Sequence, residues 1–277
     1  MRQFYGGLFF GCIVAFAHSA LAADLPVKAN SASPVATWTG FYLGATAGYG
    51  QAGDTARYQA VEPFFYGGAI LRGEIPGRLD AEGRGFIGGI TAGYNYQPNS
   101  AYAVGFETDI SYSDIKGTKT FVSTPILFDP TITTRQVNRL NWLGTARVRG
   151  GVLVTSSLLA YASGGLAYGG VSTETHTSVS PGLVGAPPFC GPAGNIWCGD
   201  GSASKVMFGW TAGAGLEQAL PNGWSAKAEY LYYDLGRVSY DHLSQSPAGL
   251  LAMSVDSSIR GHIGRIGLNY KFGPSAQ

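Results

Sequence analysis

Eight charged side chains carry the strongest candidate chemistry in this sequence, because they share the polar face of stretches in which polar and apolar residues alternate. They are Glu107, Asp109, Arg147, Arg149, Glu217, Lys227, Glu229 and Arg265. Glu107 and Asp109 have the residue types of a general acid/base pair. Four acids balanced by four bases favour a network of ion pairs instead, since a buried charge is stable only beside its partner. We therefore expect a structural network and no catalytic residue.

Two cysteines, Cys190 and Cys198, are separated by seven residues rich in glycine and proline. In an oxidising compartment this spacing predicts a disulfide that closes a small extracellular loop. In the chain-entropy model the bond would restrain the loop by roughly 2–3 kcal/mol. Two thiolates without nearby histidines do not make a zinc site, so we expect no metal.

The remaining chemical candidates are weaker. His176 and His242 fall in predicted loops and are candidates for binding haem or metal, although a lone loop histidine is usually solvated. Ser258 and His262 resemble a hydrolase pair only loosely, because residues four apart on a strand lie ~13 Å apart and no third group completes a triad. Residues 48–53 match G-x-G-x-x-G, but no helix follows, so we expect no dinucleotide cofactor.

Strands must position these side chains. In the stretch 208–236, apolar residues occupy every second position, and a period of two indicates a strand. Pro221, Asn222 and Gly223 supply the turn chemistry for a hairpin. One face carries charges beside glycine, whereas the other carries aromatic residues at its ends and small apolar residues between them. A transmembrane β-barrel alternates polar-in and apolar-out in this way.

The same pattern recurs along the chain. It predicts strands near 38–49, 86–96, 102–112, 140–149, 158–172 and 264–272, besides the hairpin at 208–236. Long loops are expected at 51–83, 114–135, 173–204 and 237–255. In the fourth strand we expect Leu140 and Trp142 to face outward and Asn141 inward. The fold class is therefore all-β: an eight-stranded antiparallel up-and-down transmembrane β-barrel with short periplasmic turns and long extracellular loops, its narrow interior filled by side chains.

Composition agrees with a barrel. Charged residues make up 13% of the chain, about half the usual share, while glycine reaches 42 and tyrosine 16. The net charge of +1 gives no electrostatic case for binding nucleic acid. After the N-terminus, no apolar run reaches the ~20 residues that a membrane helix needs.

The N-terminus has the features of a secretory signal peptide. An apolar stretch ends in Ala20-Leu21-Ala22, which predicts cleavage between Ala22 and Ala23. A membrane anchor is the alternative, and the shortness of the apolar run disfavours it. The expected organisation is a signal peptide at 1–22, a flexible periplasmic leader at 23–37, the barrel at 38–272 and a C-terminal extension at 273–277.

Five stretches point to one family. They are WTGFYLG at 38–44, NWLGTARVRGG at 141–151, YASGGLAYGG at 161–170, GWTAGAGLEQALPNGWSAKAEYLYYDLG at 209–236 and RIGLNYKF at 265–272. With these, the chain resembles the alphaproteobacterial outer-membrane immunogenic protein family. Its members are porin-like eight-stranded barrels related in architecture to the OmpA membrane domain.

The C-terminal stretch also resembles the signal that the barrel-assembly machinery reads in new outer-membrane proteins. The matching residues are Arg265, Gly267, Tyr270 and Phe272. The resemblance implies this machinery as a partner during biogenesis.

These observations predict an integral barrel of the outer membrane with a structural, surface-exposed role in the cell envelope and at most weak passage of small solutes. Its expected partners are outer-membrane lipid and lipopolysaccharide. The alternatives are a small diffusion porin, an outer-membrane enzyme that modifies lipid, and a binder of a loop ligand such as haem. A soluble lipocalin-like binder would need the reverse pattern, with an apolar interior and a polar exterior.

Overall fold

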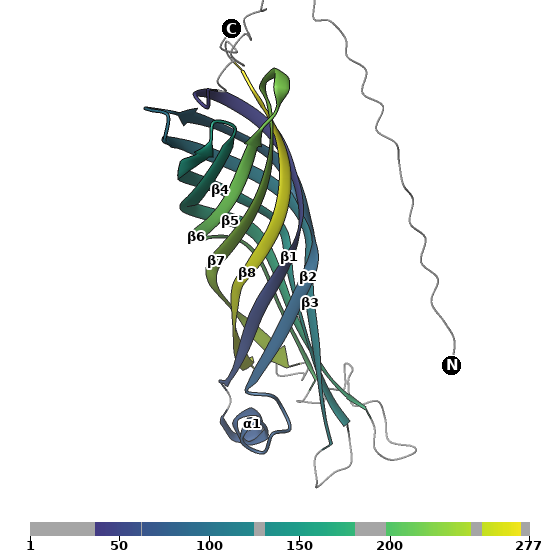
Figure 1. Ribbon diagram of the computed structural model, residues 1–277. Helices are drawn as coiled ribbons and strands as arrows, with labels where there is room; N and C mark the ends of the chain where they lie inside the picture. The colour runs from purple at the N-terminus through teal and green to yellow at the C-terminus, as the bar shows by residue number, and fades with distance from the viewer. Residues whose placement is uncertain (1–36, 62, 125–130, 181–197, 245–250, 273–277) are drawn as a thin grey trace, which may run out of the picture. The chain divides into compact units, whose positions relative to one another are not determined.

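The computed structural model describes residues 37–61, 63–124, 131–180, 198–244 and 251–272. Within them, eight antiparallel strands pair in chain order, and the last pairs with the first to close a barrel (Figure 1). The strands are β1 (Gly40–Ala60), β2 (Arg78–Tyr96), β3 (Tyr102–Ser123), β4 (Thr131–Thr155), β5 (Leu158–Ser180), β6 (Gly199–Ala219), β7 (Trp224–Ser244) and β8 (Leu251–Lys271). The predicted fold class is confirmed.

The short connections lie at the end of the barrel where β8 finishes, which is uppermost in Figure 1. The β6–β7 turn is the short 3-10 segment Pro221–Gly223 (η2), in which Asn222 and Gly223 have φ values of 61° and 79°. These left-handed conformations suit asparagine and glycine, and they reverse the chain within a few residues. No helix among the described residues is long and apolar enough to cross a membrane.

Near the short turns, the faces of the strands agree with the sequence pattern. Phe41, Ile90 and Val148 face outward with 68%, 66% and 69% of their surface exposed, whereas Tyr42 and Thr46 lie in the lumen. Outward aromatic rings stack across strands, as Phe41 and Tyr94 do with centroids 4.7 Å apart. Successive side chains of a strand point to opposite faces, so one polar and one apolar row follow directly from the alternation.

The strands extend further from the membrane than expected, so each of the predicted loops at 51–83, 114–135, 173–204 and 237–255 is too long at both ends. β1 continues to Ala60 and β2 begins at Arg78. The pattern fails there because the two faces exchange polarity. In β1, Ala56 and Tyr58 are buried in the lumen, while Arg57 points outward.

A β-bulge corrects the facing of the fourth strand. The register passes from Leu140↔Val171 to Trp142↔Gly170 and leaves Asn141 without a register partner on β5. The extra residue shifts the alternation by one position. Leu140 is therefore buried in the lumen and Asn141 is exposed, the reverse of the expectation.

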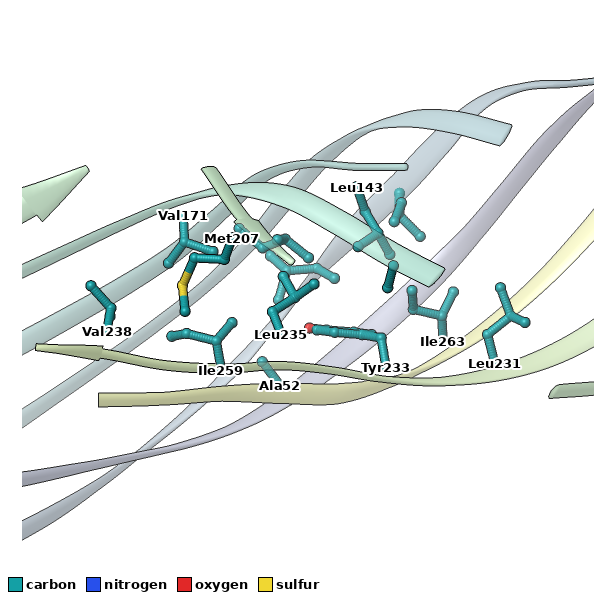
Figure 2. Packing of buried hydrophobic residues seen from close by; sticks show 14 residues of the cluster. Ala52, Leu143, Val171, Met207, Leu231, Tyr233, Leu235, Val238, Ile259 and Ile263 are labelled. Atoms are coloured by element: carbon teal, nitrogen blue, oxygen red, sulfur yellow. The ribbon is translucent and has the colours of Figure 1, made fainter. Parts of the chain in front are cut away.

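Side chains fill the lumen in successive layers. Nearest the short turns lies a small apolar cluster that includes Trp38, Ala103 and Leu159, and the charged residues follow it. Next comes an apolar cluster in which Leu231, Tyr233 and Ile263 point into the same space (Figure 2). Farther along, Gln136 joins a layer of hydroxyl and amide groups, and its Nε2 donates to the Thr173 hydroxyl at 2.8 Å. This order places the charged layer between the apolar cluster and the periplasmic end.

A short helical segment covers the opposite end of the barrel. It consists of the π-helix Pro63–Gly67 (η1) and α1 (Gly68–Leu71), which appears at the bottom of Figure 1. Ala69 and Ile75 are fully buried, and they belong to an apolar cluster that includes Met253 inside the barrel. The extracellular end is therefore packed as well.

Candidate functional site

The structure brings all eight predicted charged residues together in the lumen. They come from β3, β4, β6, β7 and β8, and each has 6% or less of its surface exposed. Strand register explains the meeting. Glu107 lies directly opposite Arg147, and Glu229 lies opposite Arg265. On neighbouring strands such opposed residues have Cβ atoms about 5 Å apart, so oppositely charged side chains meet without bending the sheet.

Glycine provides the room for these long side chains. Gly165 lies opposite Arg147, and a Cβ built at Gly165 would lie 2.8 Å from the Arg147 Cα. Gly48 lies opposite Arg265, and its Cβ would lie 2.6 Å from the Arg265 Cβ. Both contacts are too short for real atoms. Glycine beside charge on the inward face is therefore a steric requirement of a narrow, charge-filled barrel.

Arg147 is the centre of the network and is fully buried. Its guanidinium donates to Glu107 and to Asp109, the latter at 3.0 Å, and on its other side to Glu229 at 2.6 Å. One arginine thus joins carboxylates from β3 and β7 across the lumen. Arginine suits this role because its planar group presents five donors in a fixed arrangement.

Arg265 completes the same side of the network. It donates to Glu229 at 2.8 Å and to both carboxylate oxygens of Asp109, at 3.2 and 3.0 Å. Lys227 adds a third cation and donates to Glu107 at 2.8 Å. Each of these carboxylates therefore contacts at least two cations.

Arg149 extends the network toward the periplasmic end. It donates to Glu217 at 2.6 Å, and its guanidinium lies 3.9 Å from the centroid of the Tyr161 ring. Tyr42 accepts a hydrogen bond from Arg149 at 3.1 Å and donates one to Glu107 at 2.7 Å. Sequence reasoning missed both tyrosines as members of the network. The inward position of Tyr42 between glycines was the available signal.

The contacts determine what the site can do chemically. Glu107 and Asp109, the candidate acid/base pair, already accept hydrogen bonds from arginine, lysine and hydroxyl donors. A carboxylate held by several cations strongly favours its charged form and is a poor proton acceptor. The geometry suits a cross-link between strands rather than proton transfer.

The histidines lie in strands, not in loops, because the strands extend beyond their predicted ends. His176 belongs to β5 and is exposed, with its ring beside the Asp200 carboxylate on β6. His242 belongs to β7 and is buried in the lumen. Within the described ranges, no group of three histidine, cysteine or acidic residues is placed to hold a metal ion.

Ser258 and His262 have separate partners. The Ser258 hydroxyl contacts the backbone of Thr55, with Thr55 N–H donating to it at 3.3 Å. His262 Nδ1 is hydrogen-bonded to the hydroxyl of Tyr230 at 2.5 Å. The glycine motif at 48–53 lies within β1.

Several predicted features remain predictions. Tyr270 and Phe272 of the assembly signal face outward with ring centroids 5.1 Å apart, but their geometry does not test recognition. Cys198 is buried beside Ile132 and Val179. Cys190, the Ala22–Ala23 cleavage site, the leader and the C-terminal extension lie outside the described residues.

Comparisons with known proteins place this geometry in a family. Residues 10–272 match the model of the outer membrane protein beta-barrel domain. The 31 kDa outer-membrane immunogenic protein of Brucella melitensis is 34% identical over 262 residues, which cover 93% of this chain and 95% of that protein. The 22 kDa outer membrane protein of Rhizobium leguminosarum is 28% identical over 220 residues, or 79% and 72% of the two chains.

Among solved structures, the outer membrane protein OprG from Pseudomonas aeruginosa is similar over 87% of this chain and 100% of that one, with 11% identity and a TM-score of 0.41. The match to the family model and the similarity to the Brucella protein extend over nearly the whole chain. This chain therefore belongs to the outer membrane protein β-barrel domain family and is located in the outer membrane.

Proposed function

We propose that the protein is a sealed barrel with a structural, surface-exposed role in the cell envelope, without enzymatic activity and with at most weak passage of small solutes. One observation carries the proposal. The ion-pair network occupies the lumen from several sides at once, and Arg147 at its centre has no exposed surface. A diffusion pore needs a continuous aqueous path, and charges that line such a path are usually hydrated.

The layers beyond the network support the same proposal. The apolar cluster around Tyr233 follows directly in the lumen, and Tyr233 itself is fully buried. Beyond it, Gln136 is fully buried and accepts a hydrogen bond from Tyr58 at 2.8 Å. A solute would have to displace each layer in turn, and a packed interior resists such displacement.

The non-enzymatic part of the proposal rests on the state of the carboxylates. A lipid-modifying enzyme needs a nucleophile and a base that contact each other at one level of the membrane. Ser258 and His262 contact different partners, and Glu107 is held by cations. The names of the Brucella relatives describe immunogenic outer-membrane proteins, which supports a role at the cell surface.

Planar-bilayer recordings test the proposal. We expect wild-type barrel to conduct ions poorly, and we expect Arg147→Ala and Glu229→Ala each to raise the conductance, because each removes part of the barrier. The matched control is Arg139→Ala on β4, whose side chain is exposed outside the lumen. A large, steady wild-type conductance that neither lumen substitution alters would instead establish a diffusion porin.

A further inference from the structure

Four arginines gather on the outward face of the barrel, on strands that are neighbours around its closure. Arg57 on β1, Arg78 on β2, Arg237 on β7 and Arg260 on β8 line a surface hollow of about 380 Å³. These four residues form the arginine cluster. The network in the lumen plays no part in it, because these side chains point away from the barrel axis.

The arginine cluster has more positive charge than its surroundings neutralise. Among the described residues, the side chains of Arg57, Arg237 and Arg260 have no carboxylate within 4.0 Å and donate no hydrogen bond to another side chain. Arg78 alone is paired, with Asp80 at 2.9 Å.

Two carboxylates also line the hollow, and both bond to other groups. Asp234 accepts a hydrogen bond from the backbone N–H of Gly236 at 2.8 Å, and Asp256 accepts one from the Ser239 hydroxyl. Together with Asp80, three aspartates thus oppose four arginines, and a net positive charge is left. Guanidinium groups bind phosphate and carboxylate oxygens through paired, charge-assisted hydrogen bonds, so the hollow suits an anion with several oxygens.

The position of the arginine cluster indicates where the anion comes from. In the β7–β8 register, Asp234↔Arg260 lies two positions beyond Tyr232↔His262 on the extracellular side and is the next pair on the outward face. Tyr232 and His262 face outward with ring centroids 5.2 Å apart. Outward aromatic rings mark the boundary between hydrocarbon and headgroups. The arginine cluster therefore begins at the headgroup level of the outer leaflet.

An apolar furrow lies on the strands that carry the arginine cluster, but closer to the membrane centre. Two hollows of about 750 and 680 Å³ share Ala47, Ala228 and Ile266 and therefore form one furrow. Gly264 lies in its floor, and a Cβ built there would have no atom within 4 Å. Small residues leave the outer wall hollow here, whereas larger outward side chains fill it on either side.

We propose that the arginine cluster and this furrow bind one anionic glycolipid of the outer leaflet, of the lipopolysaccharide class. The arginine cluster would hold the phosphate or carboxylate groups of the sugar, and the furrow would hold an acyl chain. Gly264 and Arg260 are four residues apart on β8, or ~13 Å along the strand, so headgroup and chain are contacted together. The proposal rests on the outer-membrane location and does not depend on whether the lumen is sealed.

A separate hollow on the other side of the barrel, lined by β2 to β5, provides a control within the same protein. It measures about 790 Å³, and its lining includes Val104, Val148 and Gly150 near the periplasmic end. Like Gly264, Gly150 has no atom within 4 Å of a built Cβ. No group of arginines lines this hollow on its outward side, so we expect it to accept lipid chains without headgroup selectivity.

The test measures saturable binding of purified lipopolysaccharide to the refolded full-length barrel in detergent micelles. The triple variant Arg57→Gln, Arg237→Gln, Arg260→Gln should weaken binding by about tenfold or more, because it removes the charge-assisted bonds. The charge-matched control is Lys116→Gln, Arg135→Gln, Arg139→Gln on β3 and β4, outside the hollow. It should leave the affinity within about twofold, because exposed charges there are screened.

Two further comparisons separate headgroup from chain. Gly264→Leu should fill the furrow and weaken binding of intact lipopolysaccharide, whereas Gly150→Leu should not. The affinity for deacylated lipopolysaccharide should still fall in the arginine variant but should not change in Gly264→Leu. Inorganic phosphate alone should bind far more weakly than either form of lipopolysaccharide. Heat-modifiable mobility on gels verifies that each variant is folded.

Three results would overturn the proposal. The first is equal weakening by the two triple variants, which would reduce the effect to general surface charge. The second is affinity for inorganic phosphate that matches the affinity for lipopolysaccharide, which would indicate a simple anion site. The third is that intact lipopolysaccharide binds no better than its deacylated form and that Gly264→Leu leaves its affinity unchanged. Failure of the conductance experiment would leave this proposal unaffected, since the two tests address opposite faces of the wall.

Discussion

The two halves of the barrel are built from the same strands, but their outer faces differ in polarity. In the membrane half of β1, Leu43 faces lipid and Thr46 faces the lumen. In the extracellular half of the same strand, Arg57 faces outward and Tyr58 faces the lumen. Backbone pairing with β2 continues through both halves without a change of register. The surrounding solvent, and not the strand, decides which face is apolar.

This difference implies that the halves are stabilised by different forces. Water surrounds the extracellular half, so burial of apolar side chains in its lumen gains the hydrophobic effect. Lipid surrounds the membrane half, where moving an apolar side chain inward gains little, since lipid chains are as apolar as leucine. Interior polar contacts, with Arg147 at their centre, hold that half together.

The largest effect should come from the network. Arg147→Ala would take from the buried carboxylates on β3 and β7 one of the cations that each of them contacts, at a cost of about 3–5 kcal/mol. Arg139→Ala, on the same strand but in the extracellular half, would remove an exposed pair with Glu174 worth about 0–1 kcal/mol. Urea unfolding in lipid bilayers measures both. Equal losses would contradict the view that buried ion pairs stabilise only the membrane half.

The next effect should appear in the extracellular lumen. Met253 is fully buried in the apolar cluster under α1, so Met253→Ala should destabilise that half by about 2–5 kcal/mol through lost burial and the cavity left behind. Ser254→Ala, one residue away on the outward face, should change stability by less than about 0.5 kcal/mol. Hydrogen exchange of the β8 amides measures the effect of each substitution on local stability. Unchanged protection in the methionine variant would show that this cluster does not hold the strands together.

The smallest of the three effects concerns the outer wall of β6. Ala212→Arg would place a charge against lipid near mid-depth, at a cost of about 2–4 kcal/mol. Ser202→Arg, on the same face but in the extracellular half, would meet water and should be close to neutral. The same urea experiment compares them. If Ala212→Arg left the free energy of unfolding unchanged, the membrane band would be placed incorrectly.

Sequence reasoning predicted the barrel, the number of strands and the facing of most membrane residues, because period-two alternation with apolar residues outside is a local pattern. It did not predict the extracellular half. There the alternation persists with reversed sign, as Ala56, Arg57 and Tyr58 illustrate, and a search for an apolar outer face ends too early.

The positions of the charged residues were predictable, but their contacts were not. Alternation alone places Glu107 and Arg265 inward, whereas their partners depend on the register of strands far apart in the chain. The bulge at Asn141 shows why register is hard to foresee, since one additional residue exchanges the faces of everything beyond it. Tyr161 was missed for a related reason: the glycine-rich β5 gives an ambiguous alternation, and only closure of the barrel brings the ring to Arg149.

The network also bears on the order of folding events. Lys227 and Glu107 are 120 residues apart in the chain, and Arg265 and Asp109 are 156 apart. Closing loops of that length is entropically costly and slow, and native contacts form only afterwards. A barrel with β7 and β8 still undocked would lack Lys227 and Arg265 beside the carboxylates of β3, and Glu229 beside Arg147. Docking of the last strands should therefore be cooperative, and the closed barrel should open slowly, because loss of either strand removes several ion pairs together.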